Sequence, residues 1–377
     1  MPRYRDLGLT VGLLPPGPLN AITDVEGVMV GMATLIEGEG PLVVGQGPKR
    51  TGVTVIVPHA RIGAEPVYAG CHRLNGNGEL TGLEWIRESG QLTTPVALTN
   101  THSVGVVRDA LVAAEIRGRA DATAYWSLPV VGETYDGALN DINGFHVRPE
   151  HLFAALDSAA TGPVAEGGIG GGTGMICHEF KGGTGTASRR VGEWTVGALV
   201  QANYGRRERL TVDGVPVGRE IPLTDVPSPW DEEERLAQGA EPGTGSIIAI
   251  LATDAPMLPH HLERLAQRAG LGIARVGGAG EHSSGDIFLA FSTGNVGKLG
   301  SYKIEAVIPP FDVTTIAEGS TSELFWGAIE ATEEAILNAL VAAETMVGRD
   351  GITAHRLDHA TLVEIMTRYG RGPGSTG

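Results

Sequence analysis

A serine that could serve as a nucleophile stands where a polar stretch meets an apolar one. Gly245-Ser246 is followed directly by IIAILA. A serine hydroxyl is a weak nucleophile and needs an adjacent base. The serine's own α-amine could be that base, because its pKa is about 7.7–8.0. That amine exists only after the peptide bond that follows Gly245 is cut.

The same hydroxyl could make the cut by attacking the carbonyl of Gly245. Glycine suits that position because it tolerates a strained backbone. Taken alone, a Gly-Ser pair before a strand is more typical of an ordinary turn. The pair therefore indicates either a self-cleaving precursor or a structural turn.

Composition narrows the classes of function. Of the 377 residues, 28 are Lys or Arg and 44 are Asp or Glu, so the formal net charge is −16. Such a chain repels phosphate backbones, which argues against nucleic-acid binding. Its two cysteines, Cys71 and Cys177, lie too far apart for a CxxC pair and predict free buried thiols in a reducing compartment. With no signal peptide or long apolar stretch in view, we expect a cytoplasmic protein.

Strand and helix patterns are mixed along the chain, which predicts an α/β protein with helices on sheet faces. The apolar runs that indicate strands are Gly27–Met32, Gly52–Val57, Pro95–Leu98, Ser127–Val131, Ile247–Leu251 and Ile287–Phe291. The segments with helical periodicity are Val106–Arg117, Leu258–Ala274 and Ser322–Val347. Asp225–Thr244, which is acidic and rich in Pro and Gly, predicts an exposed loop before Gly245.

Several motifs together carry a family resemblance. GTGSIIAILATDAP around Ser246 resembles the start of the smaller chain in the DmpA-type L-aminopeptidase/D-esterase family, which includes the β-peptidyl aminopeptidases. Further matches occur in order along most of the chain: NGNGELTG (75–82), NTHSVG (100–105), PVVGETYDGALNDING (129–144), GGIGGGTG (167–174), GALVQANYG (197–205) and SGDIFLAFSTGN (284–295).

The resemblance implies a four-layer αββα sandwich like that of the ornithine acetyltransferases. It implies one domain, residues 1–377, made as a precursor and cleaved into a larger chain (1–245) and a smaller chain (246–377). The processed heterodimers of the family assemble further, commonly four together. The family needs no metal or organic cofactor.

The resemblance also assigns roles to single residues. Ser246 matches the nucleophile, and Asn203 matches an asparagine that holds the oxyanion. Tyr135 matches a tyrosine near the scissile bond, and Ser284 with Asp286 matches a Ser-x-acid pair near the nucleophile. The acid is glutamate in the β-peptidyl branch, so the aspartate counts against β-peptide specificity.

Each assignment has a structural alternative. Asn203 could be a turn residue, Tyr135 a buried tyrosine whose hydroxyl finds a partner, and Asp286 a turn residue at a strand start. Glu133 and Asp136 flank Tyr135 and could bind a substrate ammonium group, although solvated loop carboxylates are the more common case.

Three other motifs favour structure over chemistry. The glycine-rich stretch 167–174 lacks the GK[ST] ending of a phosphate loop and predicts a turn that lines the substrate pocket. His260-His261 lacks the HExxH spacing of a metal site and predicts a helix N-terminus. His102-Ser103 has no GxSxG elbow beside it and predicts a turn.

The function we predict is a self-processing serine aminopeptidase. It would hydrolyse N-terminal residues from small peptides, amides or esters through an acyl-enzyme on Ser246. The alternatives are an acyltransferase of the ornithine acetyltransferase type, a β-peptidyl aminopeptidase, or an inactive scaffold. The acyltransferases usually process before threonine, and this chain offers serine.

Overall fold

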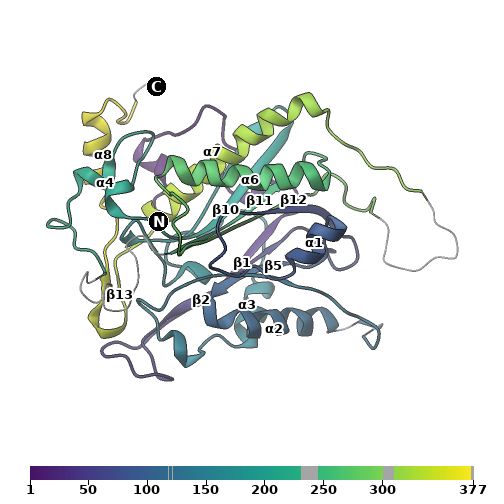
Figure 1. Cartoon of the computed structure of the whole chain (residues 1–377), viewed down its shortest axis with the longest axis horizontal. Helices are drawn as coiled ribbons and strands as arrows, with labels where there is room; N and C mark the ends of the chain where they lie inside the picture. The colour runs from purple at the N-terminus through teal and green to yellow at the C-terminus, as the bar shows by residue number, and fades with distance from the viewer. Residues whose placement is uncertain (118, 121, 231–244, 300–309, 375–377) are drawn as a thin grey trace.

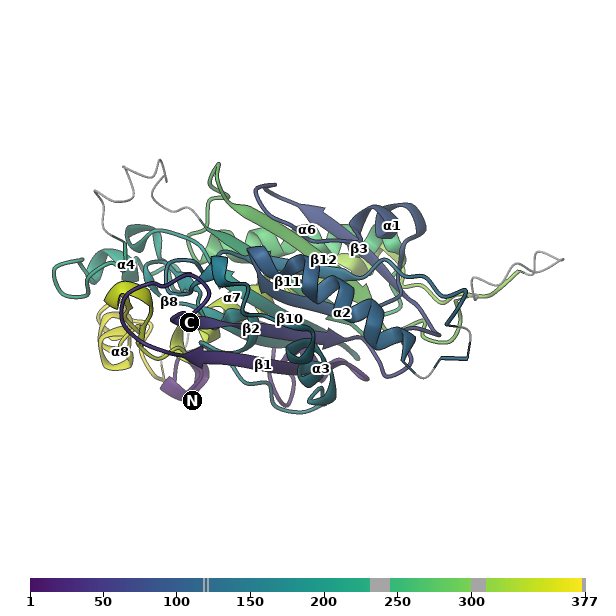
Figure 2. The same ribbon diagram turned by 90° about the horizontal axis from the view of Figure 1, so that it is seen from below.

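Two β-sheets lie face to face between helices (Figures 1 and 2). The computed structural model describes residues 1–117, 119–120, 122–230, 245–299 and 310–374. Most of the loop predicted before Gly245 therefore lies outside the described residues. The layers run helix, four-stranded sheet, six-stranded sheet, helix, so the predicted αββα sandwich is confirmed.

The four-stranded sheet has the order β1-β2-β5-β6. Its strands are β1 Met29–Glu37, β2 Lys49–Val57, β5 Val96–Asn100 and β6 Val130–Thr134. Only the β5–β6 pair is parallel. Two helices cover its outer face: α2 Val104–Ile116 and α3 Pro149–Asp157. Apolar residues of the two helices and the sheet form one buried cluster there, so this sheet has a core on its outer side.

The six-stranded sheet has the order β4-β3-β12-β11-β10-β9. Its strands are β3 Val67–Arg73, β4 Gln91–Leu92, β9 Gly183–Val191, β10 Trp194–Asn203, β11 Ser246–Thr253 and β12 Gly285–Ser292. The central β11–β12 pair is parallel and the other pairs are antiparallel. Helices α6 Pro259–Arg275 and α7 Thr321–Val341 cover its outer face.

Strand β11 shows how one apolar run serves two cores. Ile248 and Ile250 belong to the cluster between the sheets, whereas Ile247 and Ala249 belong to the cluster beneath α6 and α7. Successive side chains of a strand point to opposite faces. Because Ser246 is on the same face as Ile248, its side chain points between the two sheets.

The other α-helices and strands of the described residues are α1 Leu83–Ser89, α4 Val217–Glu220, α8 His359–Arg368, and two small hairpins, β7 Ile176–Cys177 with β8 Phe180–Lys181 and β13 Met346–Val347 with β14 Thr353–Ala354. Short 3-10 turns connect several of these elements. No helix in the described part of the chain is both long and apolar enough to span a membrane.

The predicted strands and helices are present, with shifted ends. Helix α7 ends at Val341, and Met346–Val347 form a strand instead of its last turn. Of the strands in the two main sheets, β3, β4, β9 and β10 were not predicted. Strand β9 reads GTGTASRRV, and no apolar run marks it although its first seven residues are buried. Its Arg189 is buried by pairing with Glu330 and Glu334 of α7, at 3.1 and 2.7 Å.

Candidate active site

Strand register places Ser246 beside Asn203 and Gly285. Ser246, the first residue of β11, pairs with the last residue of β10, Asn203, and with the first residue of β12, Gly285. The backbone N–H of Gly285 donates to Ser246 Oγ at 3.2 Å, and Ser246 is only 6% exposed. The hydroxyl predicted as nucleophile thus accepts a backbone hydrogen bond at the end of a central strand, on the face of the six-stranded sheet that points toward the other sheet.

Gly245 shares this donor. Its carbonyl oxygen accepts from the same Gly285 N–H at 3.3 Å. A Cβ atom on Gly245 would collide with the carbonyl oxygen of Asn203 and lie 2.8 Å from the Cα of Tyr204. The φ angle of Gly245 is outside the left-handed region. A glycine is therefore needed at position 245 because no side chain would fit there. Its backbone does not have the left-handed φ that would also favour glycine.

Ser284 and Asp286 form the predicted pair at the start of β12. Ser284 Oγ donates to Asp286 Oδ1 at 2.6 Å, and the backbone N–H of Ile247 donates to the same oxygen at 3.3 Å. Asp286 thus contacts the nucleophile's strand at the peptide group that follows Ser246. Burial raises the pKa of Asp286 to about 6, and the two hydrogen bonds oppose that rise.

Both ends of the Asn203 amide are held. Its Oδ1 accepts from the backbone N–H of Ile176 at 2.8 Å, and its Nδ2 donates to the carbonyl of Tyr135 at 3.0 Å. An amide nitrogen has two N–H groups. The Asn203 side chain faces Ser246 across the β10–β11 pair. Its second N–H is therefore available to donate to an oxyanion formed when Ser246 attacks a carbonyl group.

The structure brings the backbone of Tyr135 to the site through Asn203. The residue Tyr135 is 46% exposed, and its ring lies over Gly137. Partial burial raises the pKa of its hydroxyl. The contact with the site is therefore made by the main chain, and the hydroxyl predicted near the scissile bond packs against its own loop.

Glu133 and Asp136 have different surroundings although they flank the same tyrosine. Glu133 accepts from the hydroxyl of Thr101 and from the backbone N–H of Glu79 at 3.0 Å. A Cβ atom on Gly78 would lie 3.1 Å from both Glu133 Oε1 and the Cα of Gly285. Only one glycine thus separates the Glu133 carboxylate from the nucleophile's hydrogen-bond donor.

Asp136 is enclosed in the interior. It is 0% exposed and accepts from Asn100 Nδ2 at 3.1 Å and from Asn140 Nδ2 at 3.0 Å. Burial raises its pKa to about 7, and hydrogen bonds from its neighbours oppose that rise. These contacts hold the loop after β6 in place, so Asp136 is a structural residue and does not offer a free carboxylate to a substrate.

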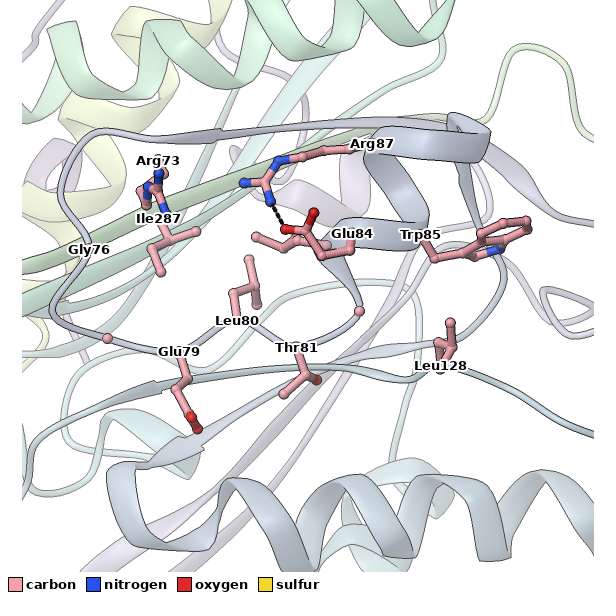
Figure 3. A pocket seen from close by; sticks show the side chains of 13 residues that line it. Arg73, Gly76, Glu79, Leu80, Thr81, Glu84, Trp85, Arg87, Leu128 and Ile287 are labelled. Atoms are coloured by element: carbon pink, nitrogen blue, oxygen red, sulfur yellow. Dashed lines mark hydrogen bonds and ion pairs between the residues drawn. The ribbon is translucent and has the colours of Figure 1, made fainter.

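A pocket of about 470 Å³ is lined mainly by the loop after β3, by α1 and by Ile287 of β12. Figure 3 shows its lining side chains. Its lining includes Leu80, Leu83 and Ile287, with the charged residues Arg73, Glu79, Glu84 and Arg87 and the aromatic Trp85. Figure 3 shows Glu84 and Arg87 joined by an ion pair. Gly78 and Ile287 connect the pocket to Gly285, because Gly78 contacts Gly285 and Ile287 lies two residues further along β12.

The histidine pair is at a helix start, as predicted. His261 is the third residue of α6, and its Nδ1 accepts from the backbone N–H of Leu258 at 3.3 Å. Its Nε2 must then carry the proton that it donates to Glu318 at 2.7 Å. His260 also approaches Glu318, at 3.5 Å, and the three side chains are close enough to surround an ion. A metal on Nε2 would require the proton on Nδ1 and would break the Leu258 contact, so a capping role fits better.

The two other motifs also have structural roles. Gly170–Gly172 form a buried helical turn, and a Cβ on Gly171 would lie 2.6 Å from the carbonyl oxygen of Leu98. This turn packs in the interior, and none of its residues lines the pocket described above, so its place beside the substrate stays a prediction. His102 and Ser103 lie in a helical turn before α2, and His102 stacks on Phe145 with ring centroids 6.1 Å apart.

Two contributors to the site were not predicted. Gly285 provides its backbone N–H, and the loop at Gly78-Glu79 connects Glu133 with β12. Both lie in motifs that the sequence shows, SGD and NGNGELTG, but a backbone donor leaves no trace in the residue type. Its position depends on the pairing of strands that are far apart in the sequence.

A buried serine at the start of a central strand, between two sheets covered by helices, is the arrangement of the N-terminal-nucleophile hydrolases. Residues 20–354 match the family described as Peptidase family S58. The chain belongs to this family, and it is a self-processing serine aminopeptidase.

Relatives and solved structures agree with this assignment. A β-peptidyl aminopeptidase, BapA, from Sphingosinicella microcystinivorans is 51% identical over 380 residues, which cover 98% of this chain and 93% of that protein. A β-aminopeptidase structure from Burkholderia sp. has a TM-score of 0.88 and 54% identity, covering 98% of this chain and 99% of that one. The L-aminopeptidase D-Ala-esterase/amidase from Ochrobactrum anthropi, described as a variant of the Ntn hydrolase fold, has a TM-score of 0.87 and 45% identity, with coverage of 98% and 99%.

Proposed function

We propose that Ser246 is the nucleophile of this aminopeptidase and that the precursor cuts itself between Gly245 and Ser246, giving chains 1–245 and 246–377. The observation that carries the proposal is the hydrogen bonding of Gly285. Its N–H contacts both Ser246 Oγ and the Gly245 carbonyl, at 3.2 and 3.3 Å. The nucleophile and the carbonyl it must attack therefore share one donor.

The self-cleavage step follows from this contact. Ser246 Oγ attacks the Gly245 carbonyl carbon, and the N–H of Gly285 stabilises the oxyanion that forms. The C–N bond breaks as the nitrogen takes up a proton, which leaves an ester between Gly245 and the Ser246 hydroxyl. That break already frees the α-amine of Ser246. Water then hydrolyses the ester, which frees the carboxylate of Gly245 and regenerates the hydroxyl of Ser246.

In turnover the new α-amine acts as the base. It takes the proton of Ser246 Oγ while the hydroxyl attacks the substrate carbonyl, and it returns that proton to the leaving group. The Asn203 N–H stabilises the oxyanion, and loss of one such donor typically costs about 2.7–4 kcal/mol. Ser284 and Asp286 lie at the peptide group after Ser246 and orient the new N-terminus.

Glu133 provides selectivity for a free N-terminus. Gly78 lines the pocket and lies against this carboxylate, so a substrate ammonium group bound in the pocket at Gly78 would be attracted to it. A charge-assisted hydrogen bond is about twice as strong as a neutral one. Burial raises the pKa of Glu133, so an arriving cation favours its ionised form. Asp136 takes no part in this recognition because its carboxylate is enclosed.

The pocket in Figure 3 receives the substrate side chain. Its lining by Leu80, Leu83 and Ile287 suits small or apolar residues. Relatives that carry the β-peptidyl name are about half identical to this chain, which favours β-residues among the substrates. The aspartate at position 286, where the β-peptidyl branch has glutamate, counted against β-residues as substrates in the sequence analysis. In the structure Asp286 contacts the backbone of Ile247 and does not line the pocket.

The processed heterodimers are proposed to assemble further, commonly four together, as the family resemblance implies. Both cysteines are free and buried, which suits a reducing compartment such as the cytoplasm. An acyltransferase reaction would need an amine acceptor to compete with water for the acyl-enzyme.

Intact-mass measurement of the purified protein tests the proposal. We expect two polypeptides, the smaller beginning at Ser246, that hydrolyse p-nitroanilides of residues with free amines. A panel of α-L, α-D and β-residues, with and without an added amine acceptor, separates aminopeptidase from acyltransferase. A single chain of 39.2 kDa that is nonetheless active would overturn the self-cleavage proposal.

A further inference from the structure

Lys181 is a fully buried lysine, and within the described residues its hydrogen-bond acceptors are all backbone carbonyls. It lies on β8, and its Nζ donates to Gly182 at 2.7 Å, to Met175 at 2.9 Å and to Gly172 at 3.4 Å. A lysine is rarely buried without a carboxylate partner. The mechanism above gives it no role, so its position calls for an explanation.

One of these carbonyls belongs to the peptide group that holds Asn203. The C=O of Met175 and the N–H of Ile176 are the two sides of the same peptide unit. Lys181 contacts the oxygen side, and the nitrogen side donates to Asn203 Oδ1 at 2.8 Å. An unbroken series of contacts therefore runs from the Lys181 ammonium group to the amide of Asn203.

The orientation of the Asn203 side-chain amide decides whether its nitrogen can donate a hydrogen bond to an oxyanion. With Oδ1 held by Ile176, the nitrogen faces the Tyr135 carbonyl and the nucleophile. The reversed amide would set its oxygen against the Tyr135 carbonyl and leave no donor for the oxyanion. A positive charge on the carbonyl side of a peptide also strengthens the hydrogen bond from its N–H, because hydrogen bonds in series polarise one another.

Close packing of the β7–β8 hairpin against β10 keeps Lys181 and Asn203 near the Met175–Ile176 peptide group. A Cβ on Gly182 would lie 2.6 Å from the carbonyl oxygen of Ala202, the residue before Asn203, and the N–H of Gly182 also donates to Met175 at 2.9 Å. The β7–β8 hairpin is thus pressed against the end of β10. Burial lowers the pKa of Lys181 to about 7, and the charge interaction with Cys177 opposes that fall.

We propose that Lys181 is a positioning residue for catalysis: through the Met175–Ile176 peptide group it fixes the direction of the Asn203 amide. The inference rests on the proposed role of Asn203 as oxyanion donor. Lys181 acts on turnover without touching the substrate. Self-cleavage depends on it less, because the Gly245 carbonyl takes its hydrogen bond from Gly285.

The test compares Lys181→Met with Leu362→Ala, each made alone and each also combined with Asn203→Ala. Leu362 is a buried core residue of α8, so its truncation lowers Tm without contacting the site. In the processed enzyme we expect K181M to lower kcat roughly 10–100-fold, less than the 10²–10³-fold loss of an entire oxyanion donor, with KM changed less than about 3-fold. L362A should leave kcat unchanged at a comparable fall in Tm.

The double variants separate the two proposals. If Lys181 acts through Asn203, adding K181M to N203A causes no further fall in kcat. A K181M effect of equal size in both backgrounds, or a K181M protein that stays uncut while N203A is cut, would overturn the role of Lys181 and leave that of Asn203 intact. An N203A enzyme with parental kcat would instead remove the proposed oxyanion role, and the inference with it. A K181M enzyme that behaves like L362A would show that Lys181 is needed only for stability.

Discussion

The two sheets contribute to the site in different ways. At the end of the six-stranded sheet, Ser246, Asn203 and Gly285 come from three adjacent strands and are aligned by backbone pairing. At the end of the four-stranded sheet, Glu133 and Tyr135 come from β6 and the loop after it. The first group is set by register, and the second group depends on side-chain and loop contacts.

This difference suggests a division of work. A slip of one residue in a strand pair turns every side chain to the opposite face, so register holds the reacting groups rigidly. A loop can change in length and contacts without disturbing the sheet. We therefore assign bond making and breaking to the six-stranded sheet and recognition of the substrate amine to the four-stranded one.

Removing the nucleophile gives the largest expected effect on the six-stranded side. Ser246→Ala should remain a single 39.2 kDa chain and show no hydrolysis, since both steps need the hydroxyl. Intact mass and p-nitroanilide turnover are the measurements. Ser292→Ala is a matched control, because Ser292 is a buried serine at the far end of β12 that donates to the Ala255 carbonyl. A cut or active S246A would refute the assignment.

A methyl group at Gly245 should disturb the register itself. In Gly245→Ala the Cβ would collide with the Asn203 carbonyl and force β10 and β11 apart. We expect self-cleavage to slow by at least roughly 10-fold, because small misplacements at a reacting centre can cost about 10²-fold. The appearance of the 246–377 chain on a time-resolved denaturing gel reports the rate. Gly105→Ala in α2, where a Cβ meets open space, is the control, and equal rates for the two variants would contradict the prediction.

Neutralising Glu133 tests the recognition side. Glu133→Gln should raise KM for substrates with a free amine by roughly 10-fold, a loss of about 1.4 kcal/mol, while kcat changes less. The effect should be absent for a des-amino ester of similar size, which has no ammonium group to bind. Glu150→Gln, at an exposed position in the first turn of α3, serves as the control. Parallel losses for amine and des-amino substrates would refute ammonium binding.

The smallest effect on activity is expected at Asp136. Its pKa is raised to about 7 in the folded protein, against 3.8 as the ordinary value. The folded state then binds the proton more tightly, so this stabilisation is complete below about pH 4 and is lost as the pH rises through 7. The Tm of the parent relative to Asp136→Asn should therefore fall by several degrees from pH 5 to pH 8, with kcat nearly unchanged. A Tm difference that does not depend on pH would exclude a raised pKa.

Sequence patterns predicted the fold where apolar runs are long. Strand β11 and helix α6 are found close to their predicted ranges. A strand buried on both faces has a continuous apolar run, and a helix buried on one face has apolar residues with a period of 3.6, so both patterns can be read from the sequence. Strand β9 was missed because its buried residues are two glycines, two threonines, an alanine, a serine and an ion-paired arginine, which form no apolar run. Nothing local indicates that α7 supplies the carboxylates that neutralise Arg189.

The sequence by itself determined the Gly245-Ser246 pair and the residue types for a nucleophile, an oxyanion donor and an acid. Their chemistry depends on side-chain groups that can be read from single positions. Only the tertiary structure decided that Glu133 rather than Asp136 lies beside Gly78 and Gly285, that the backbone carbonyl of Tyr135 accepts from Asn203, that the N–H of Gly285 donates to Ser246 Oγ, and that Lys181 contacts the peptide group that holds Asn203. Those outcomes depend on burial and on hydrogen bonds between strands and loops far apart in the chain, which no local pattern encodes.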